Sequence, residues 1–226
     1  EEFQKVLSLH ASMMHVALEE FDQYCDFNSW LCDIHIFCKK WSDKSVKEFK
    51  GSAAFTIEQK LTEIRQWSEK VRNFDRYFVS ENGMFYIDCS IIHNVLLPKL
   101  DEIYQELITF VSEEGKTLAK LFVSDMQTVL QNLKKKHASV GAFAIYAKNY
   151  YQYKKNMPNY QQRIEYIKSL FEVIRMSYRQ LSAEEEKLEE SVWALWEAFM
   201  MQMQDAAEFV NTQTPVMTRQ LEDTYQ

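Results

Sequence analysis

The chain has 226 residues, 46% of them apolar and 14% aromatic, which is enough to bury a sizeable core as one large or two small units. Its formal net charge of −7 disfavours DNA, RNA, anionic lipid and the acidic outer surface of microtubules, because polyanions are recognised through basic residues. Four glycines and three prolines leave few of the tight turns that sheets and phosphate loops require, so we expect a mostly helical protein.

Cysteine content and hydropathy bear on location. Four cysteines in a chain of this length, with no Asn-x-Ser/Thr sequon and no apolar signal segment at the start, predict a reducing, cytosolic compartment. No apolar run approaches the ~18 residues of a membrane span, so we expect no membrane insertion. Because the first residue is not Met, we expect the sequence to be an excerpt from a longer chain.

The first 80 residues have the pattern of amphipathic helices. Apolar residues at helical steps predict helices over 3–24 and 27–41, and the polar run 42–52 predicts a loop. A further helix is expected to begin at Thr56 and to continue over six turns towards Asn82-Gly83, a strong turn dipeptide. Its apolar stripe consists of Ile57, Leu61, Ile64, Trp67, Val71, Phe74 and Phe78.

Beyond that turn, glycine and proline suggest where helices end. A helix is expected from about 90 to 110, and Gly115 separates it from a second helix that ends near 133. Two more helices are predicted over about 138–153 and 160–178, with a break at Pro158 between them. Short connections between long amphipathic helices indicate antiparallel neighbours.

The last long helix is the best marked. We expect it over 183–213, with Ser182 and Glu185 at the spacing of a capping box and Pro215 at its end. Apolar side chains occupy roughly 160° of its circumference, which indicates two neighbouring helices. At ~1.5 Å per residue it would extend ~45 Å. We therefore predict an all-α fold, an elongated bundle of about seven or eight long antiparallel amphipathic helices with one short extended segment near 84–89.

The cluster Cys25, Cys32, His35 and Cys38 is the first candidate site, because Cys and His are the usual zinc ligands. On a continuous helix the first three would share a face, but Cys38 lies about 120° away from Cys32, and the C-x2-C turn is missing. Small buried hydrophobic residues are the favoured interpretation of these cysteines. We predict no metal site.

Catalytic motifs have no support in the sequence. Gly115-Lys116-Thr117 is similar to the end of a phosphate loop, but Phe110 stands where the first glycine belongs. No histidine follows a glutamate by three residues, and no His-Glu-x-x-His or Gly-x-Ser-x-Gly motif is present. We therefore predict no catalytic residue, no cofactor site and no enzymatic activity for this segment.

Two features of the last helix remain as candidates. Glu184–Glu186 are interpreted as a solvated helix start, since the helix dipole favours acidic residues in a first turn. Trp193, Trp196 and Phe199 either fill the core of the bundle, which we favour, or form an exposed surface for a partner, where aromatic residues are enriched.

One resemblance is more specific than composition. It rests on Ile164-Glu165-Tyr166-Ile167-Lys168-Ser169-Leu170-Phe171, on 178–186, on Trp193 to Phe199, on Ala206 to Leu221, and upstream on 84–89 and 96–104. Over roughly 84–226, this pattern of aromatic and apolar positions resembles the stem of axonemal dynein heavy chains just before the linker. Residues 1–80 fit a helical stem but add little to the resemblance.

The resemblance implies a non-catalytic stem segment in two parts, 1–80 and 84–226, of a microtubule-based, ATP-driven ciliary motor whose catalytic ring lies outside this sequence. It implies contacts with dynein intermediate chains, neighbouring heavy chains and docking proteins in the cytoplasm and the ciliary axoneme, without direct microtubule binding. Two alternatives stay open: an unrelated cytosolic, spectrin-like tethering bundle, and a helical metalloprotein that uses the region Cys25–Cys38.

Overall fold

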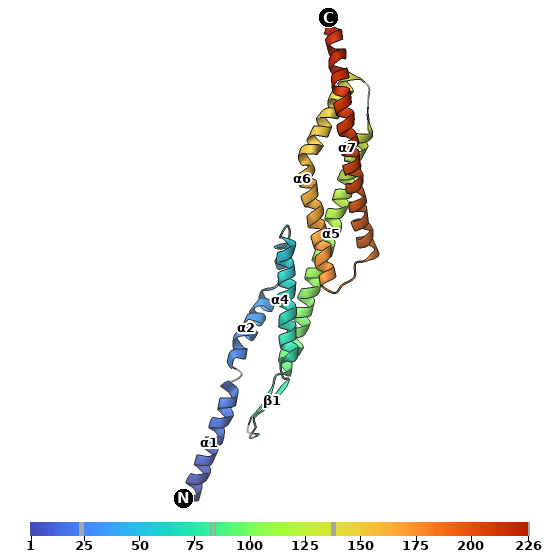
Figure 1. The fold of residues 1–226 in the computed structure, drawn as a ribbon. Coiled ribbons are helices and arrows are strands. Elements are labelled where there is room, and N and C mark those ends of the chain that lie inside the picture. Colours follow the sequence, from blue (N-terminus) through green and yellow to red (C-terminus); the bar gives the residue numbers. More distant parts are fainter. Residues whose placement is uncertain (23–24, 82, 84, 137–138, 226) are drawn as a thin grey trace. The chain divides into compact units, whose positions relative to one another are not determined.

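A computed structural model describes residues 1–22, 25–81, 83, 85–136 and 139–225, with side chains described except at 21–29, 43, 44, 224 and 225. The described residues form seven helices and two short strands (Figure 1). The helices are α1 (Glu2–Asp22), α2 (Cys25–Lys40), α3 (Asp43–Lys47), α4 (Ala54–Asn73), α5 (Ser90–Lys134), α6 (Val140–Met176) and α7 (Ala183–Tyr225). The strands are β1 (Tyr77–Val79) and β2 (Tyr86–Asp88). The expected all-α bundle is confirmed.

The chain divides into two compact units, Glu1–Thr109 (unit 1) and Phe110–Gln226 (unit 2). The boundary falls inside α5 and so differs from the division 1–80 and 84–226 that the resemblance implies. The difference arises because α5 continues as a helix from one unit into the other.

Unit 1 is built around three helices: α2, α4 and the first part of α5. The Lys70 ammonium lies 5.9 Å from the Trp30 ring centre and the Lys60 ammonium 5.4 Å from the Phe37 ring centre, so α2 and α4 are antiparallel. Their core consists of Ile34, Cys38, Ile64, Val71, Leu96, Leu100 and Ile103. The indole N–H of Trp41 donates to Glu106 Oε2 at 2.8 Å and fixes the end of α2 against α5.

Unit 2 is also built around three helices: the second part of α5, α6 and α7. Between α5 and α6, Arg163 pairs with Asp125 at 2.8 Å, and the Tyr146 hydroxyl donates to the Leu133 carbonyl at 3.0 Å. Between α6 and α7, the rings of Tyr160 and Phe199 lie 5.6 Å apart. In both pairs the residue number rises along one helix and falls along the other, so the neighbours are antiparallel (Figure 1).

The predicted helix breaks at Gly115, Pro158 and Pro215 are wrong, because α5, α6 and α7 continue through them. At Gly115, α5 lies close to α6: a Cβ added there would lie 3.2 Å from the Phe171 ring. Both prolines are exposed, so water can hydrate the carbonyl that loses its backbone donor. Packing on either side then keeps the helix continuous.

The region between α2 and α5 also differs from the prediction. The expected loop 42–52 contains α3, and α4 ends at Asn73 rather than continuing past Phe78. The buried His93 of α5 donates from Nε2 to the Phe74 carbonyl at 2.9 Å, which holds the chain in an extended conformation just after α4. Residues 77–79 then form β1, which pairs with β2 in an antiparallel hairpin, Phe78 opposite Ile87. The extended segment expected near 84–89 therefore corresponds to β2.

Candidate functional site

The start of α7 contains a buried polar centre around Glu185, whose side chain has no solvent exposure. The Ser182 N–H donates to Glu185 Oε2 at 2.7 Å, and the Glu185 N–H donates to Ser182 Oγ at 3.3 Å. The capping box predicted from the sequence is therefore present. The hydroxyl of Ser112, itself buried in α5, donates to Glu185 Oε1, and Arg179 lies 3.7 Å from the same oxygen.

The interpretation of Glu184–Glu186 as a solvated helix start is wrong for Glu185 alone, since its two neighbours are exposed. Burial by itself raises the pKa of the Glu185 carboxyl, but hydrogen bonds from Ser112 and Ser182, together with the Arg179 charge, outweigh burial and hold the pKa below its ordinary value. The carboxylate therefore stays ionised and joins α5, the α6–α7 connection and α7.

The three aromatic residues singled out in the sequence divide between core and surface. Phe199 is fully buried, and its ring contacts Tyr160 of α6 and stacks on Trp196 with centres 5.4 Å apart. Trp196 is half-buried, and Trp193 is 38% exposed. The Lys168 ammonium from α6 lies 5.7 Å from the centre of the Trp193 ring, within the range of a cation–π interaction.

An apolar surface therefore lies along α7 beside the α6–α7 seam. Its members are Trp193 and, seven residues later on the same face, Met200, which is 43% exposed. We call these two residues the α7 surface. An aromatic ring beside a flexible thioether is a common composition for protein contacts.

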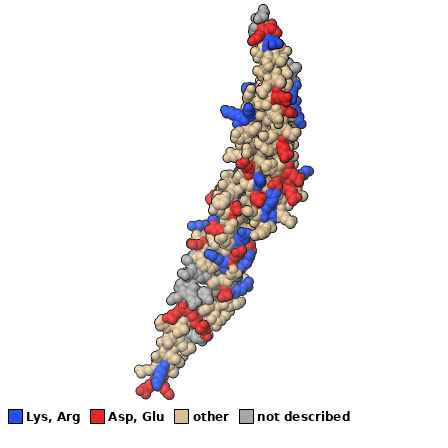
Figure 2. Space-filling model, viewed as in Figure 1, with Lys and Arg blue, Asp and Glu red and all other residues tan. Residues whose placement is uncertain are grey.

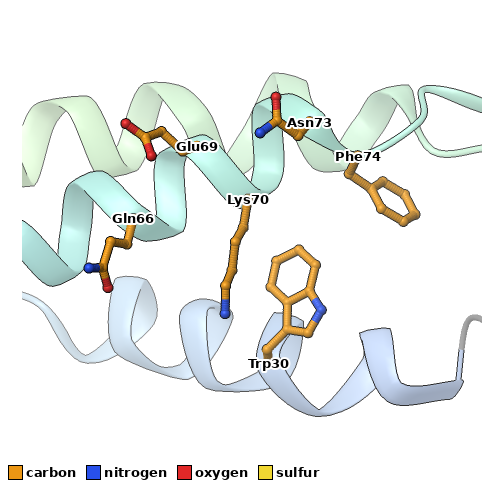
Figure 3. Close-up of a pocket in the computed structure, with 6 residues that line it drawn as sticks. All are labelled: Trp30, Gln66, Glu69, Lys70, Asn73 and Phe74. Atoms are coloured by element: carbon orange, nitrogen blue, oxygen red, sulfur yellow. The ribbon is translucent and has the colours of Figure 1, made fainter.

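A groove of about 490 Å³ lies between α2 and α4 in unit 1 (Figure 3). Its lining consists of Trp30, Gln66, Glu69, Lys70, Asn73 and Phe74. Lys70 extends from α4 towards α2, beside the Trp30 indole. The lining has no serine, cysteine or histidine, so it offers no nucleophile paired with a base for acyl transfer.

The predicted zinc candidates are not gathered in the described part of the chain. Cys38 is buried in the core of unit 1, where burial raises the pKa of its thiol, while Cys32 and His35 are exposed on other faces of α2. The side chain of Cys25 lies outside the described residues. Among the residues that the structure describes, no three His, Cys, Asp or Glu side chains come close enough together to hold a metal ion.

The surface charges are mixed. On the face seen in Figure 2, Lys and Arg are interspersed with Asp and Glu among uncharged residues, and no continuous basic stripe is visible on this face. Within the described ranges, none of the helices combines the length and the low polarity that a bilayer span requires.

Taken together, these features define an all-α protein in which each of two compact units is built around three helices. No family model matches the chain. It is 20% identical over 207 residues to mouse (Mus musculus) Dynein heavy chain domain-containing protein 1, and 18% identical over 189 residues to the human (Homo sapiens) protein of that name. The alignments cover 92% and 84% of this chain but only 4% of each relative.

The chain is thus distantly similar, over most of its length, to a dynein heavy chain domain-containing protein, and it spans a small part of that protein's length. The resemblance found in the sequence is confirmed at this coarser level.

Proposed function

We propose that the chain is a non-catalytic stem segment of a dynein heavy chain, a structural and subunit-contacting part of a microtubule-based, ATP-driven ciliary motor. The observation that carries this proposal is the similarity to Dynein heavy chain domain-containing protein 1 over 92% of the chain. No residue of the segment is assigned a role in ATP hydrolysis, and the segment requires no cofactor.

The packing supports a mechanical role. In unit 2, α6 and α7 are in contact along their length. The rings of Phe143 and Phe209 meet near one end, those of Tyr160 and Phe199 meet in the middle, and Arg175 pairs with Glu189 near the other end. A seam of this kind resists sliding, because any shift along the axis breaks many contacts at once. Segments that transmit force need this property.

The exposed apolar residues support a role in subunit contact. We expect the α7 surface to contact another dynein subunit: an intermediate chain, a neighbouring heavy chain or a docking protein of the ciliary axoneme. An exposed indole on a stable helix offers apolar area at low cost in conformational entropy, and the flexible thioether of Met200 can adapt its shape to a partner. Direct binding to nucleic acid, membrane or the microtubule is not part of this function.

The test is affinity capture from ciliary extract with residues 1–226 as bait, followed by mass spectrometry. Three baits are compared: the unchanged chain, a Trp193→Glu/Met200→Glu variant of the α7 surface, and an Ile145→Glu control at an exposed site on α6. Enrichment of dynein subunits by the first and third baits, and loss with the second, is the expected result. Folded bait that enriches no dynein subunit refutes the subunit-contacting role and favours a passive spacer.

A second candidate is a spectrin-like cytosolic tether without dynein partners. The observation that favours it is the architecture: two three-helix units share one continuous helix, α5, which ends one bundle and begins the other. The same capture experiment separates the two functions. Consistent enrichment of trafficking or general cytoskeletal proteins, without dynein subunits, would support the tether.

A further inference from the structure

Helix α1 exposes most of its apolar side chains. Phe3, Val6, Leu7, Leu9, Met14, Val16 and Leu18 are each between 46% and 75% exposed. Between residues 2 and 20, where the side chains of α1 are described, Ala17 alone is buried and Met13 is half-buried. A two-turn apolar stripe would need no explanation, but seven large exposed side chains on one helix form a contiguous apolar surface of the kind that marks a binding site.

The exposed side chains cover a wide arc. At about 100° per residue, the apolar positions from Val16 round to Leu18 span roughly 200° of the helix circumference. Helix α7 has a narrower apolar arc than α1, and it already packs against two helices, α5 and α6. We therefore expect α1 to need one or two further helices along its length, and the described part of unit 1 does not supply them.

The charges of α1 indicate what kind of helix fits. Glu1 and Glu2 stand at one end and Glu19 at the other, beside Glu20, whose carboxylate accepts a hydrogen bond from the Glu81 N–H at 3.1 Å. Lys5 is the single Lys or Arg in α1. Figure 2 shows this end of unit 1 as largely uncharged surface between acidic groups. The two acidic ends are about 27 Å apart, at ~1.5 Å per residue.

This charge pattern disfavours two occupants. A second copy of α1 would bring acidic ends together in either orientation, since a parallel pair and an antiparallel pair both place glutamates opposite glutamates. An anionic membrane is disfavoured for the same reason, because interfacial helices bind such surfaces through Lys and Arg. The complementary occupant is a helix whose two ends are basic.

We propose that α1 is a docking helix for a partner polypeptide that presents an amphipathic α-helix of about five turns, with an apolar central stripe and Lys or Arg near both ends. The apolar side chains of α1 supply the contact area, and its acidic ends set the register of the partner. This inference stands on α1 alone and does not depend on the dynein-related function.

The test uses the whole 226-residue chain and two fluorescent synthetic peptides of about 20 residues with one shared Leu/Ala stripe. One peptide has lysines at both ends and the other has glutamates. Fluorescence anisotropy at about 0.15 M salt measures binding, so that long-range attraction to the net negative chain is screened. We expect the lysine peptide to bind at least tenfold more tightly than the glutamate peptide.

Variants then assign the site. Val6→Glu/Leu9→Glu in α1 should weaken binding of the lysine peptide at least tenfold, whereas Leu121→Glu/Ile145→Glu, at equally exposed positions of unit 2, should leave it unchanged. Glu2→Lys/Glu19→Lys should reverse the preference in favour of the glutamate peptide. All substituted positions are exposed, and circular dichroism checks that each variant keeps its helix content.

Several outcomes would overturn the proposal. They are the absence of binding, equal binding of both peptides, and equal loss with the unit 2 variant. Self-association that disappears with Val6→Glu/Leu9→Glu, measured by sedimentation, would assign the α1 face to a second copy instead. The capture experiment with the α7 surface uses other residues, so either proposal can fail while the other stands.

Discussion

Replacing Glu185 with alanine should destabilise unit 2 more than any other single change of an acidic residue in α7. The carboxylate is fully buried and accepts hydrogen bonds from the Ser112 hydroxyl and the Ser182 N–H. Alanine removes both bonds and leaves the two donors without their acceptor. The hydrogen bond from the buried Ser112 also joins α5 to α7, so the loss affects tertiary packing as well as the helix cap.

The magnitude follows from the two bonds. A hydrogen bond to a charged group contributes about 1.5–3 kcal/mol, so two of them give an upper range of about 3–6 kcal/mol. Part of this is recovered, because the Ser112 hydroxyl can turn back to the carbonyl four residues earlier in α5 and water can reach the Ser182 N–H. We expect a net loss of about 3 kcal/mol in the free energy of unfolding, with the Arg179 ion pair adding little because that side chain is 39% exposed.

Urea unfolding followed by circular dichroism measures this loss. Glu186→Ala is the matched control, since Glu186 is exposed in the same helical turn and should cost no more than about 0.5 kcal/mol. A double-mutant cycle with Ser112→Ala should give a coupling energy of at least about 1 kcal/mol. The reasoning is refuted if Glu185→Ala and Glu186→Ala have the same midpoint, or if the effects of Glu185→Ala and Ser112→Ala simply add.

Three further predictions concern the same unit. The native pKa of Glu185 lies below its ordinary value of 4.5, so the stability that its carboxylate contributes is complete above that pH and is lost as the pH falls through the native pKa. The difference in unfolding free energy between the unchanged chain and Glu185→Gln should therefore shrink in acid titrations below about pH 4.5. Gly115→Val should cost about 2 kcal/mol through overpacking, whereas Gly141→Ala, where nothing lies within 4 Å, should not destabilise; thermal melts of both variants decide this. Phe199→Ala should cost about 3–5 kcal/mol and Trp193→Ala less than about 1 kcal/mol, and equal costs in urea titrations would contradict the division into core and surface.

Local chemistry accounts for what the sequence predicted well. Each apolar stripe repeats within one helix, and the pair Ser182 and Glu185 satisfies backbone donors only three residues apart. Such features depend on neighbouring residues, so the type of fold, the antiparallel order and the start of α7 could be inferred.

Partners far apart in sequence explain what the sequence did not predict. Gly115 remains helical because it packs against Phe171, which is 56 positions further along the chain. The Phe74 carbonyl ends α4 because it meets His93 of another helix. Helix propensity alone predicts a break at Gly115 and a continued helix at Phe74. In both cases a tertiary contact outweighs a preference of about 1 kcal/mol.

A partner far away in the sequence also decides which glutamate is buried in the acidic first turn of α7. Three consecutive glutamates all suit the helix dipole, so sequence alone cannot separate a solvated residue from a buried one. Ser112 makes the difference by offering a donor to the middle glutamate from 73 positions away. A serine facing inward from a neighbouring helix is therefore the feature that would identify a buried acid in such a turn. It can be recognised only once the register of the two helices is known.

Trp193 and Phe199 extend this reasoning to function. They are six residues apart, so their side chains point about 120° apart around the helix. Both lie within its wide apolar arc, and periodicity alone cannot tell which of the two is more buried. Their neighbours differ: the Phe199 ring packs against Tyr160 and is fully buried, whereas Trp193 stays 38% exposed beside the Lys168 ammonium. A partner that binds the α7 surface must displace or share that cation, so an acidic or amide group next to its apolar contact would favour binding. Lys168→Met should then weaken capture of the partner while leaving the stability of unit 2 nearly unchanged.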